Sequence, residues 1–282
     1  MAKQVLVLTG AGQIGMAIAR RMGHGKKIVI ADRKKVHAEN IGQIMAEAGF
    51  DVVLWEADIS SRQSIGQLVQ FAQCEGDITV FVNAAGISPS QATIEQILQV
   101  DLYGTALLLE EFGKVIQPGG AGVTISSQSG HRMPALTADE DRLLATTATD
   151  DLLHLDLLKP ENIKDTLHAY QIAKRCNVKR VMAEAVKWGE RGARINSISP
   201  GIIMTPLALD ELNGPRGAFY KNMFAQSPAR RPGTADEVAT VAELLLSEKG
   251  AFITGTDILM DGGATASYYY GSLQPSNDDT NN

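Results

Sequence analysis

The chain has 282 residues and a formal net charge of −6, from 26 lysines and arginines against 32 aspartates and glutamates, which argues against nucleic acid as its main partner. Its two distant cysteines, Cys74 and Cys176, indicate no disulfide framework, no apolar run reaches the ~18 residues of a membrane span, and the first residues lack a secretory signal pattern. We therefore expect one large α/β domain in the reducing cytoplasm, with no membrane partner and, because the five histidines show no ligand spacing, no metal site.

The N-terminal residues predict a strand, a glycine-rich loop and a helix in direct succession. Gln4 to Thr9 is a short apolar run typical of a buried parallel strand, and a helical pattern follows from Met16 to Met22. Between them stands Gly-Ala-Gly-Gln-Ile-Gly, whose glycines allow close backbone approach to a pyrophosphate that the helix N-terminus attracts. We therefore predict dinucleotide binding by the loop residues Gly10, Gly12, Gln13, Ile14 and Gly15.

A second predicted strand, residues 27–31, ends at Asp32, twenty residues after Gly12. This is the offset of an acid that bonds the adenosine ribose, although an ordinary solvated acid would look the same. A carboxylate here repels a 2′-phosphate, whereas the neighbouring Arg33 would clamp one. Because Asp32 stands at the strand end and the glycine loop carries no basic residue, the sequence favours NAD over NADP.

Strands and helices alternate through the rest of the chain. Further strands are predicted at 51–56, 79–82, 122–126, 194–199 and 257–260, and helices at 62–73, 93–115, 167–189 and 235–247. Repeated strand-helix-strand units with apolar strands imply a doubly wound α/β fold, with a parallel seven-stranded sheet and helices on both faces. Ligands of such sheets bind beyond the carboxyl ends of the strands. The candidate residues at or just past these ends are Thr9, Asp32, Asp58, Asn83, Ser127 and Pro200.

Tyr170 and Lys174 lie four residues apart in the predicted 167–189 helix and therefore on one face of it. A tyrosine hydroxyl ionises near pH ~10, and lowering its pKa to ~7 requires roughly 4 kcal/mol. A close, partly desolvated lysine together with a second cation supplies interactions of that size. Such a pair occurs by chance in many helices, but its place beside the other motifs makes it a candidate acid–base pair.

Together these motifs resemble those of the short-chain dehydrogenase/reductases of the single-domain type, over nearly all of residues 4–263. The resemblance rests on the glycine loop and Asp32, Asp58-Ile59, Asn83-Ala84-Ala85-Gly86, Ile125-Ser126-Ser127, Tyr170 with Lys174, Ser199-Pro200-Gly201 with Thr205, and Asp261-Gly262-Gly263. It implies a Rossmann-type fold and an NAD(P)-dependent oxidoreductase that transfers a hydride between a nicotinamide cofactor and a small-molecule secondary alcohol or ketone. Two other classes stay open, an epimerase or dehydratase on the same fold and an NAD-binding regulator without catalysis.

The resemblance also implies a role for each matching residue. Tyr170 would exchange a proton with the substrate oxygen, Ser127 would hydrogen-bond that oxygen, and Lys174 would hold the nicotinamide ribose and lower the Tyr170 pKa. The remaining implied cofactor contacts are Asp58 and Ile59 beside the adenine, Asn83, Ala84, Ala85 and Gly86, then Pro200, Gly201 and Ile203, and Thr205 at the nicotinamide amide or the phosphates. The family's Ile-x-Ser pattern selects Ser127 over Ser126, which we expect to satisfy local backbone groups.

The sequence departs from the family pattern in the glycine loop and at Asp101. The loop is one residue shorter than usual, so the phosphate cradle is expected to survive while side-chain contacts near the adenosine differ. Asp101, in the sequence Val-Asp-Leu, stands where the family usually has an asparagine that helps to hold a water for proton relay. Three roles stay open for this fourth candidate catalytic residue: it keeps the relay, it adds a negative charge that tunes Lys174, or it only supports a helix bend.

A third departure is an acidic insertion of about residues 131–165, expected to hold a further helix or two. This insertion and residues 187–194 resemble those of bacterial 3α-hydroxysteroid dehydrogenase/carbonyl reductases. We take this resemblance as an indication of subunit packing and pocket shape. The substrate class that we consider is a hydroxysteroid or another small apolar ketone. We expect residues 1–263 to form the single dinucleotide-binding and catalytic domain, with an apolar substrate lid at about 205–231 and a loosely ordered tail at 264–282. The family's assemblies imply a homo-oligomer, a dimer or tetramer. Either the insertion remodels or covers a subunit contact, or it stands clear and an ordinary tetramer forms.

Overall fold

The computed structural model describes residues 3–215 and 217–275; the other residues of the predicted domain, lid and tail (1–2, 216 and 276–282) lie outside this described part. At its centre is one sheet of seven parallel strands in the order β3-β2-β1-β4-β5-β6-β7. The strands are β1 (Gln4–Thr9), β2 (Lys27–Asp32), β3 (Asp51–Glu56), β4 (Asp77–Asn83), β5 (Ala121–Ile125), β6 (Arg194–Pro200) and β7 (Asp257–Met260). The predicted parallel seven-stranded sheet is confirmed.

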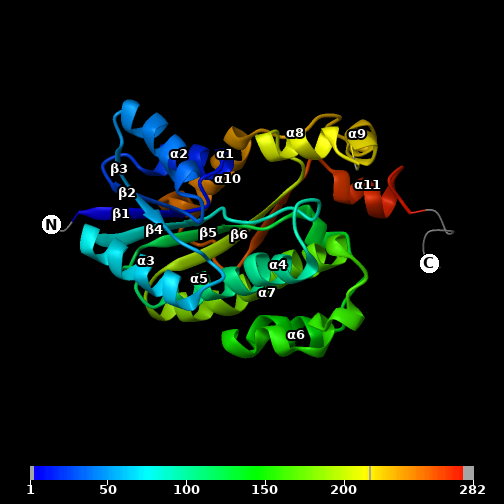
Figure 1. Cartoon of the computed structure of the whole chain (residues 1–282), viewed down its shortest axis with the longest axis horizontal. Helices are drawn as coiled ribbons and strands as arrows, with labels where there is room; N and C mark the ends of the chain where they lie inside the picture. The colour runs from blue at the N-terminus through cyan, green and yellow to red at the C-terminus, as the bar shows by residue number, and fades with distance from the viewer. Residues whose placement is uncertain (1–2, 216, 276–282) are drawn as a thin grey trace.

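Helices cover both faces of this sheet (Figure 1). One face carries α1 (Gln13–Met22), α2 (Lys35–Glu47) and α10 (Ala235–Leu246), and the other carries α3 (Arg62–Glu75), α5 (Thr105–Gly113) and α7 (Thr166–Glu190). Alternation along β1 explains the two layers, because Val5 and Val7 belong to the core beneath α3, α5 and α7, whereas Leu6 and Leu8 belong to the core beneath α1, α2 and α10. Trp188 of α7 is fully buried and donates from Nε1 to the Leu109 carbonyl oxygen at 3.1 Å, which joins α7 to α5.

The predicted helix at 93–115 forms in three parts. α4 (Ile94–Ile97) passes into a π-helix, η1 (Leu98–Gly104), and then into α5. Short π segments within helices are often found at functional sites. Here the π-helix contains Asp101, whose side chain has no exposed surface.

The insertion packs on the outer side of α7 (Figure 1). The expected further helix is α6 (Ala138–Thr146), and the 3₁₀ turns η3 (Thr149–His154), η4 (Asp156–Leu158) and η5 (Pro160–Asn162) follow it. Buried leucines of these elements form a third apolar core with residues of α7 and η1. Arg180 of α7 is also buried and donates from Nη1 to the carbonyl oxygens of Leu144 and Thr147, at 3.4 and 2.7 Å. The insertion is therefore held on the domain by apolar packing as well as by hydrogen bonds.

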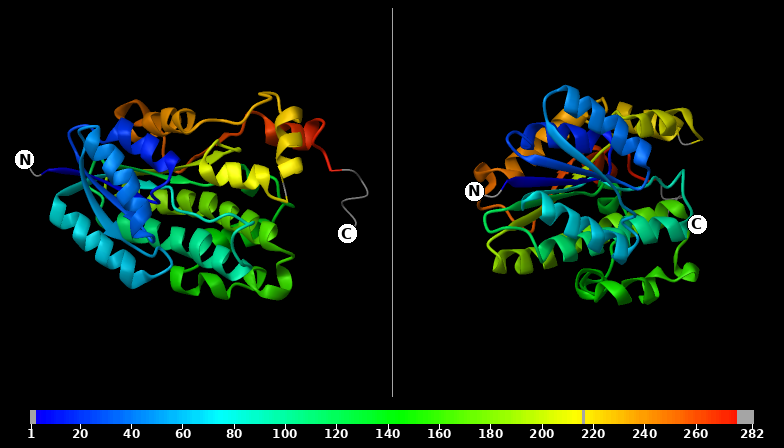
Figure 2. Two further views of the ribbon diagram at one scale, coloured as in Figure 1. Left: turned by 45° about the horizontal axis from the view of Figure 1, so that its top comes forward. Right: turned by 60° about the vertical axis from the view of Figure 1, so that its left-hand side comes forward.

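The lid region and the start of the tail form three helices at one end of the sheet, α8 (Pro206–Asn213), α9 (Gly217–Gln226) and α11 (Ala264–Tyr270) (Figure 2). The expected tail at 264–282 thus begins with a helix, α11, that contacts the rest of the chain. The Ser267 hydroxyl of α11 donates to the Gln226 carbonyl oxygen at 2.9 Å, and the Tyr269 hydroxyl donates to the His131 carbonyl oxygen at 2.6 Å. These two hydrogen bonds connect α11 to α9 and to the end of η2.

Within residues 3–215 and 217–275, no helix combines the length and the apolar character that crossing a bilayer requires. The same residues contain no group of three or more His, Cys, Asp or Glu side chains that suits a metal ion.

Candidate active site

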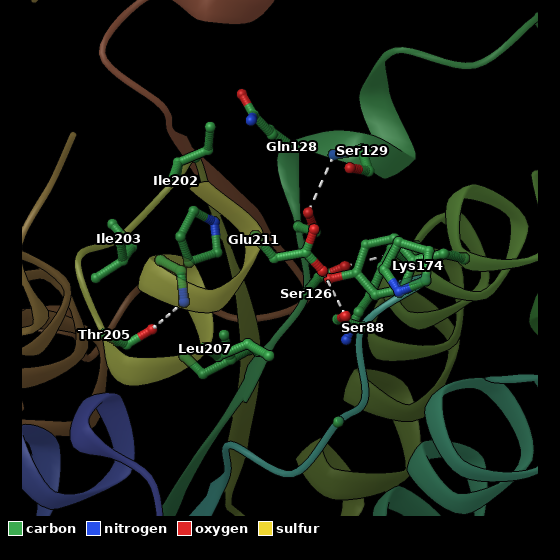
Figure 3. A pocket seen from close by; sticks show the side chains of 18 of the residues that line it. Ser88, Ser126, Gln128, Ser129, Lys174, Ile202, Ile203, Thr205, Leu207 and Glu211 are labelled. Carbon is green, nitrogen blue, oxygen red and sulfur yellow. Dashed lines mark hydrogen bonds between the residues drawn. The ribbon is translucent and has the colours of Figure 1, made fainter. Parts of the chain in front are cut away.

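The segments that follow β1, β4, β5 and β6 surround a cavity of about 600 Å³ at the carboxyl edge of the sheet (Figure 3). α7, α8, α9 and α11 complete its lining. The predicted site residues that line it are Ile14, Ala84, Ala85, Gly86, Ser127, Tyr170, Lys174, Pro200, Gly201, Ile203 and Thr205. The predicted residues outside this lining are Gly10, Gly12, Gln13, Gly15, Asp32, Arg33, Asp58, Ile59, Asn83 and Asp101.

Tyr170, Lys174 and Ser127 come together in this cavity. Tyr170 and Lys174 lie on one face of α7, with the Lys174 Nζ 5.2 Å from the centroid of the Tyr170 ring. Ser127, directly after β5, caps the 3₁₀ turn η2 (Gln128–His131), and its side chain is near enough to Tyr170 to lower the pKa of that hydroxyl. The Ser126 hydroxyl instead donates to the Lys174 carbonyl oxygen at 2.8 Å. Ser126 therefore ties β5 to α7, while Ser127 is the serine that faces Tyr170.

The surroundings of Tyr170 shift its pKa in both directions. Burial raises the pKa most strongly, the Lys174 ammonium lowers it, the Asp101 carboxylate raises it, and the hydrogen bond with Ser127 lowers it. The net direction is upward from the ordinary value of a tyrosine. The Lys174 ammonium thus lowers the pKa of Tyr170, as expected, but by less than burial raises it. The second cation invoked from the sequence is still required to bring this hydroxyl toward neutrality.

Asp101 lies behind the cavity and faces Lys174. Its Oδ1 accepts the Ile87 N–H at 3.0 Å and lies 4.0 Å from the Lys174 Nζ, while its buried Oδ2 has no hydrogen-bond partner among the described residues. Burial raises the pKa of Asp101, against the opposing effect of Lys174. A Cβ at Gly86 would lie 2.9 Å from the Asp101 Oδ1 and 3.4 Å from the Lys174 Nζ, so this loop approaches the pair more closely than a larger residue allows. Of the three open roles, this geometry favours a charge that acts on Lys174.

The N-terminus of α1 fits an anionic cofactor. Gly12 offers no side-chain cap and the first turn of α1 contains no acidic residue, so the first N–H groups of the helix have no partner within it. A Cβ at Gly12 would meet no atom within 4 Å, so this side of the loop is open. Gly10 has a φ of +88°, and a Cβ there would overlap the Ala85 nitrogen, so only glycine lets the loop pack against the end of β4. Free N–H groups at an accessible helix N-terminus are the donors that a pyrophosphate requires.

Asp32 connects the end of β2 to this glycine loop. Its Oδ2 accepts the Ala11 N–H at 2.9 Å, and its Oδ1 accepts the Lys34 N–H, also at 2.9 Å. An ionised carboxylate offers about four acceptor positions, so Asp32 retains capacity for ribose hydroxyls. The neighbouring Arg33 is exposed to solvent. The carboxylate is therefore fixed beside the loop, whereas the arginine extends no described hydrogen bond to it and is exposed.

Two of the predicted cofactor residues use their side chains mainly for local structure. The Asn83 Oδ1 accepts hydrogen bonds from the Thr9 hydroxyl at 3.0 Å and from the Ala85 N–H at 3.2 Å. The Asp58 Oδ1 accepts from the N–H and the hydroxyl of Ser60 at 2.9 and 2.6 Å. Asn83 is buried, so it shapes the loop that follows β4 rather than lining the cavity with its side chain.

The sequence did not indicate the residues that join α8 to the cavity wall. Glu211 of α8 accepts hydrogen bonds from the hydroxyls of Ser88 and Ser90, at 2.5 and 2.7 Å, and thereby ties α8 to the segment after β4 (Figure 3). Arg132 and Gln171 were also missed in the cavity lining. The available signal for Glu211 was an acidic pair, Asp210 and Glu211, in a segment rich in leucine.

Comparison with known proteins identifies the relatives of this chain. A family model described as short chain dehydrogenase matches residues 3–138, and one described as Enoyl-(Acyl carrier protein) reductase matches residues 142–265. The chain is 41% identical to the Short-chain dehydrogenase/reductase bsc3 of Alternaria brassicicola, over 94% of this chain and 97% of the relative. It is 29% identical to a 3-alpha-hydroxysteroid dehydrogenase/carbonyl reductase of Comamonas testosteroni, over 74% and 82%. A solved short-chain dehydrogenase/reductase from Serratia marcescens matches with a TM-score of 0.72 at 21% identity, over 93% of this chain and 98% of that one.

The doubly wound parallel sheet with a cavity at its carboxyl edge defines a Rossmann-like α/β protein. The relatives show which kind: the chain belongs to the short-chain dehydrogenase/reductase family and is an oxidoreductase. The family binds a nicotinamide cofactor, and relatives of this chain are dehydrogenases and reductases of alcohols and ketones. The family membership inferred from the sequence motifs is confirmed.

Proposed function

We propose that this enzyme transfers a hydride between NAD and a secondary alcohol or ketone, with Tyr170 as the acid–base group. The observation that carries the proposal is the position of Tyr170, which has both the Ser127 hydroxyl and the Lys174 ammonium against it in one cavity. A panel of secondary alcohols, polyols and hydroxysteroids, offered with NAD and followed by the absorbance of the nicotinamide band, tests it. We expect oxidation within at least one class; no change with any alcohol or with the matching ketones and NADH would contradict it.

The chain's own groups supply the proton chemistry in this proposal. When bound, the nicotinamide gives a hydride to the carbonyl carbon or takes one from the carbinol carbon. In reduction, the Tyr170 hydroxyl donates its proton to the substrate oxygen, and in oxidation the Tyr170 oxygen takes that proton back. The Ser127 hydroxyl donates a hydrogen bond to the same oxygen, which stabilises the charge that develops there. The Lys174 ammonium stabilises the phenolate form of Tyr170.

The lid suggests the character of the substrate. Leu207, Phe219 and Tyr220 from α8 and α9 line the cavity together with Leu167 of α7. Such a lining favours a substrate with an apolar frame. A relative is named a 3-alpha-hydroxysteroid dehydrogenase/carbonyl reductase, so hydroxysteroids and other small apolar ketones form the substrate class that we propose.

We predict that the unmodified protein binds NAD more tightly than NADP. The Asp32 carboxylate is held beside the glycine loop, where it accepts ribose hydroxyls and repels a 2′-phosphate, whereas Arg33 is exposed and must give up side-chain freedom to bind that phosphate. Titration of both cofactors by calorimetry measures the preference. Asp32→Ser should reduce the preference by about tenfold or more, because it removes about 1.4 kcal/mol or more of discrimination.

Arg33→Met is the matched control for the cofactor preference, since it removes the neighbouring cation and leaves the carboxylate in place. It should leave NAD binding unchanged and weaken NADP binding. Tighter binding of NADP than of NAD by the unmodified protein would show that Arg33, and not Asp32, decides the cofactor.

We further propose that the protein forms a homo-oligomer through the C-terminal half of α7 and the segment before β7. Met182, Val186 and Phe252 are apolar residues with largely exposed side chains there. Gly255 approaches α7 closely, because a Cβ at this glycine would lie 3.1 Å from the Ala185 Cβ. The insertion covers the N-terminal half of α7 and η1, so the chain itself occupies that surface. A second copy of the chain is the expected partner of the exposed apolar residues.

Val186→Glu combined with Phe252→Glu should reduce the molar mass of the particle in light scattering. The two carboxylates would be buried without partners in the proposed contact, which costs several kcal/mol. Val36→Glu, at an exposed apolar residue of α2, is the control and should leave the mass unchanged. A monomeric unmodified protein, or an unchanged mass in the double variant, would refute this contact.

A further inference from the structure

Arg132 is a partly buried cation in the cavity lining, at the end of η2. Its backbone is fixed close to the catalytic helix: its N–H donates to the Ser129 carbonyl oxygen at 3.3 Å, and its carbonyl oxygen accepts the Gln171 Nε2 at 3.1 Å. Gln171 follows Tyr170 directly in α7. The arginine is therefore attached to the same wall of the cavity as Tyr170.

The guanidinium of Arg132 has no ion-pair partner in the described part of the chain. Its buried Nε makes no hydrogen bond there, and no carboxylate oxygen of residues 3–215 or 217–275 lies within 4.0 Å of its nitrogens. The Cζ lies 5.8 Å from the centroid of the Tyr268 ring, an aromatic contact that leaves the N–H edges of the guanidinium unused. Burial lowers the pKa of Arg132, against the weaker opposing effect of the Asp261 carboxylate. The group still remains charged at neutral pH.

Other buried or partly buried arginines donate side-chain hydrogen bonds within this fold, although the buried Nε of Arg180 has no partner among the described residues either. Arg180 donates to two carbonyl oxygens and to the Thr149 hydroxyl. Arg175 forms two hydrogen bonds to the Asp141 carboxylate, and Arg194 donates to several carbonyl oxygens. A desolvated guanidinium without such partners is costly. Arg132 therefore differs from them in a way that a bound anion would resolve.

We propose that Arg132 binds a carboxylate of the substrate, so that the enzyme acts on hydroxy acids or keto acids whose carboxylate is separated from the reacting carbon by an apolar frame. This inference rests on the proposed function, because it takes Tyr170 to mark the reacting carbon. One guanidinium matches one planar carboxylate through two parallel hydrogen bonds. The apolar residues Leu167, Leu207 and Phe219 line the same cavity and suit the frame between the two polar ends.

The remaining charges of the cavity direct the carboxylate toward Arg132. Lys174 lies against Tyr170 and faces the buried Asp101 carboxylate. Glu211, with both oxygens held by serine hydroxyls, repels an anion placed beside α8. Asp261 attracts Arg132 only at longer range, since its own oxygens accept the N–H groups of Gly263 and Thr265 at 2.9 and 2.7 Å. Among the described cavity residues, Arg132 is thus the cation that is left for a substrate anion.

Calorimetric binding of matched acid and ester ligands tests this proposal. The probes are oxo-fatty acids from 4-oxopentanoate to 10-oxoundecanoate and their methyl esters, titrated into the protein with NAD, which cannot reduce a ketone. The unmodified protein should bind the best acid roughly 10- to 100-fold more tightly than its ester, as expected for a hydrogen-bonded charge. Arg132→Gln should remove this difference in affinity, because it weakens the binding of the acid and not that of the ester. Arg132→Lys should restore part of the difference.

Arg142→Gln is the control, because Arg142 is an exposed arginine of the insertion that pairs with Asp139 away from the cavity. It should leave the binding of both ligands unchanged. The proposal would be overturned if the unmodified protein bound acid and ester equally, or bound neither. It would also be overturned if Arg132→Gln weakened the binding of both ligands equally, which would indicate a structural role for Arg132. Turnover with NADH is judged separately: reduction of neutral ketones without preference for the acid refutes the role of Arg132 alone, whereas a bound acid that is never reduced counts against the proposed function.

Discussion

Replacing Tyr170 with phenylalanine should lower turnover by about 10²- to 10⁴-fold, the range that a positioned acid–base group contributes. The substitution removes one oxygen from a buried ring and leaves the packing of α7 in place. Without the hydroxyl, neither the Ser127 side chain nor any other cavity residue that we describe takes over proton exchange with the substrate oxygen. Cofactor affinity should change little, so the loss should appear in kcat and not in the dissociation constant of NAD.

Tyr103→Phe is the matched control for this variant. Its hydroxyl donates to the Asp150 carboxylate of the insertion at 3.3 Å and lies outside the cavity. This control should retain normal turnover. Near-normal turnover in Tyr170→Phe, or an equal loss in both variants, would remove Tyr170 from the proposed chemistry.

Replacing Lys174 with methionine should have the largest effect on stability that we expect from the site, together with a large loss of activity. Lys174 is almost fully buried and is the cation that faces the Asp101 carboxylate. Its removal leaves Asp101 to stay charged without a partner or to take up a proton. Protonating a carboxyl whose unfolded pKa is ~3.9 costs roughly 4 kcal/mol at pH 7. Because Asp101 can always take up a proton instead of staying charged, this cost is the upper limit of the destabilisation.

The pH dependence distinguishes this explanation from simple loss of packing. Burial already raises the folded-state pKa of Asp101 above its unfolded value, and loss of Lys174 removes a group that lowers it. A carboxyl whose pKa is higher in the folded protein than in the unfolded chain favours folding fully at a pH below its unfolded pKa. Its contribution to the free energy of unfolding is lost as the pH rises through its folded pKa. The free energy of unfolding of Lys174→Met, relative to the unmodified protein, should therefore fall from acidic toward neutral pH.

The double variant Asp101→Asn with Lys174→Met provides the control, since it contains neither charge. Denaturant unfolding at several pH values should show that it recovers most of the stability at pH 7 and lacks the added pH dependence. A single variant that is equally destabilised at every pH, or a double variant that is no more stable than the single one at pH 7, would argue against coupling between these side chains.

The strands were the elements that the sequence predicted best. β1, β3 and β7 have the predicted bounds, because each is a short apolar run bounded by polar residues, although only β1 is a buried central strand. α2 was not predicted at all. It begins after Lys34 without a side-chain cap, and its buried residues are Ala38, Gly42 and Met45, so both its start signal and its apolar stripe are weak. The predicted long helix at 93–115 exists, but no local pattern indicated its π segment.

In the candidate site, too, the sequence indicated the residues of local patterns and not those that act through tertiary contacts. The glycine loop and the Tyr170–Lys174 pair were visible because each is a local pattern whose spacing carries its geometry. Arg132 and Glu211 were not visible, since their significance comes from tertiary contacts between segments far apart in the chain. The role of Asn83 was equally invisible, because its side chain forms hydrogen bonds to Thr9 and Ala85 that the sequence does not indicate.

Hydride transfer is measured directly by following an isotopic label from the reduced cofactor to the substrate. NADH in which both hydrogens of the reactive nicotinamide carbon are replaced by deuterium is incubated with the protein and the ketones of the substrate panel. The products are analysed by mass spectrometry and NMR. We predict an alcohol with one deuterium on the carbinol carbon and none on the oxygen after exchange with water. An alcohol without deuterium at that carbon, or no alcohol from any ketone that binds, would contradict it.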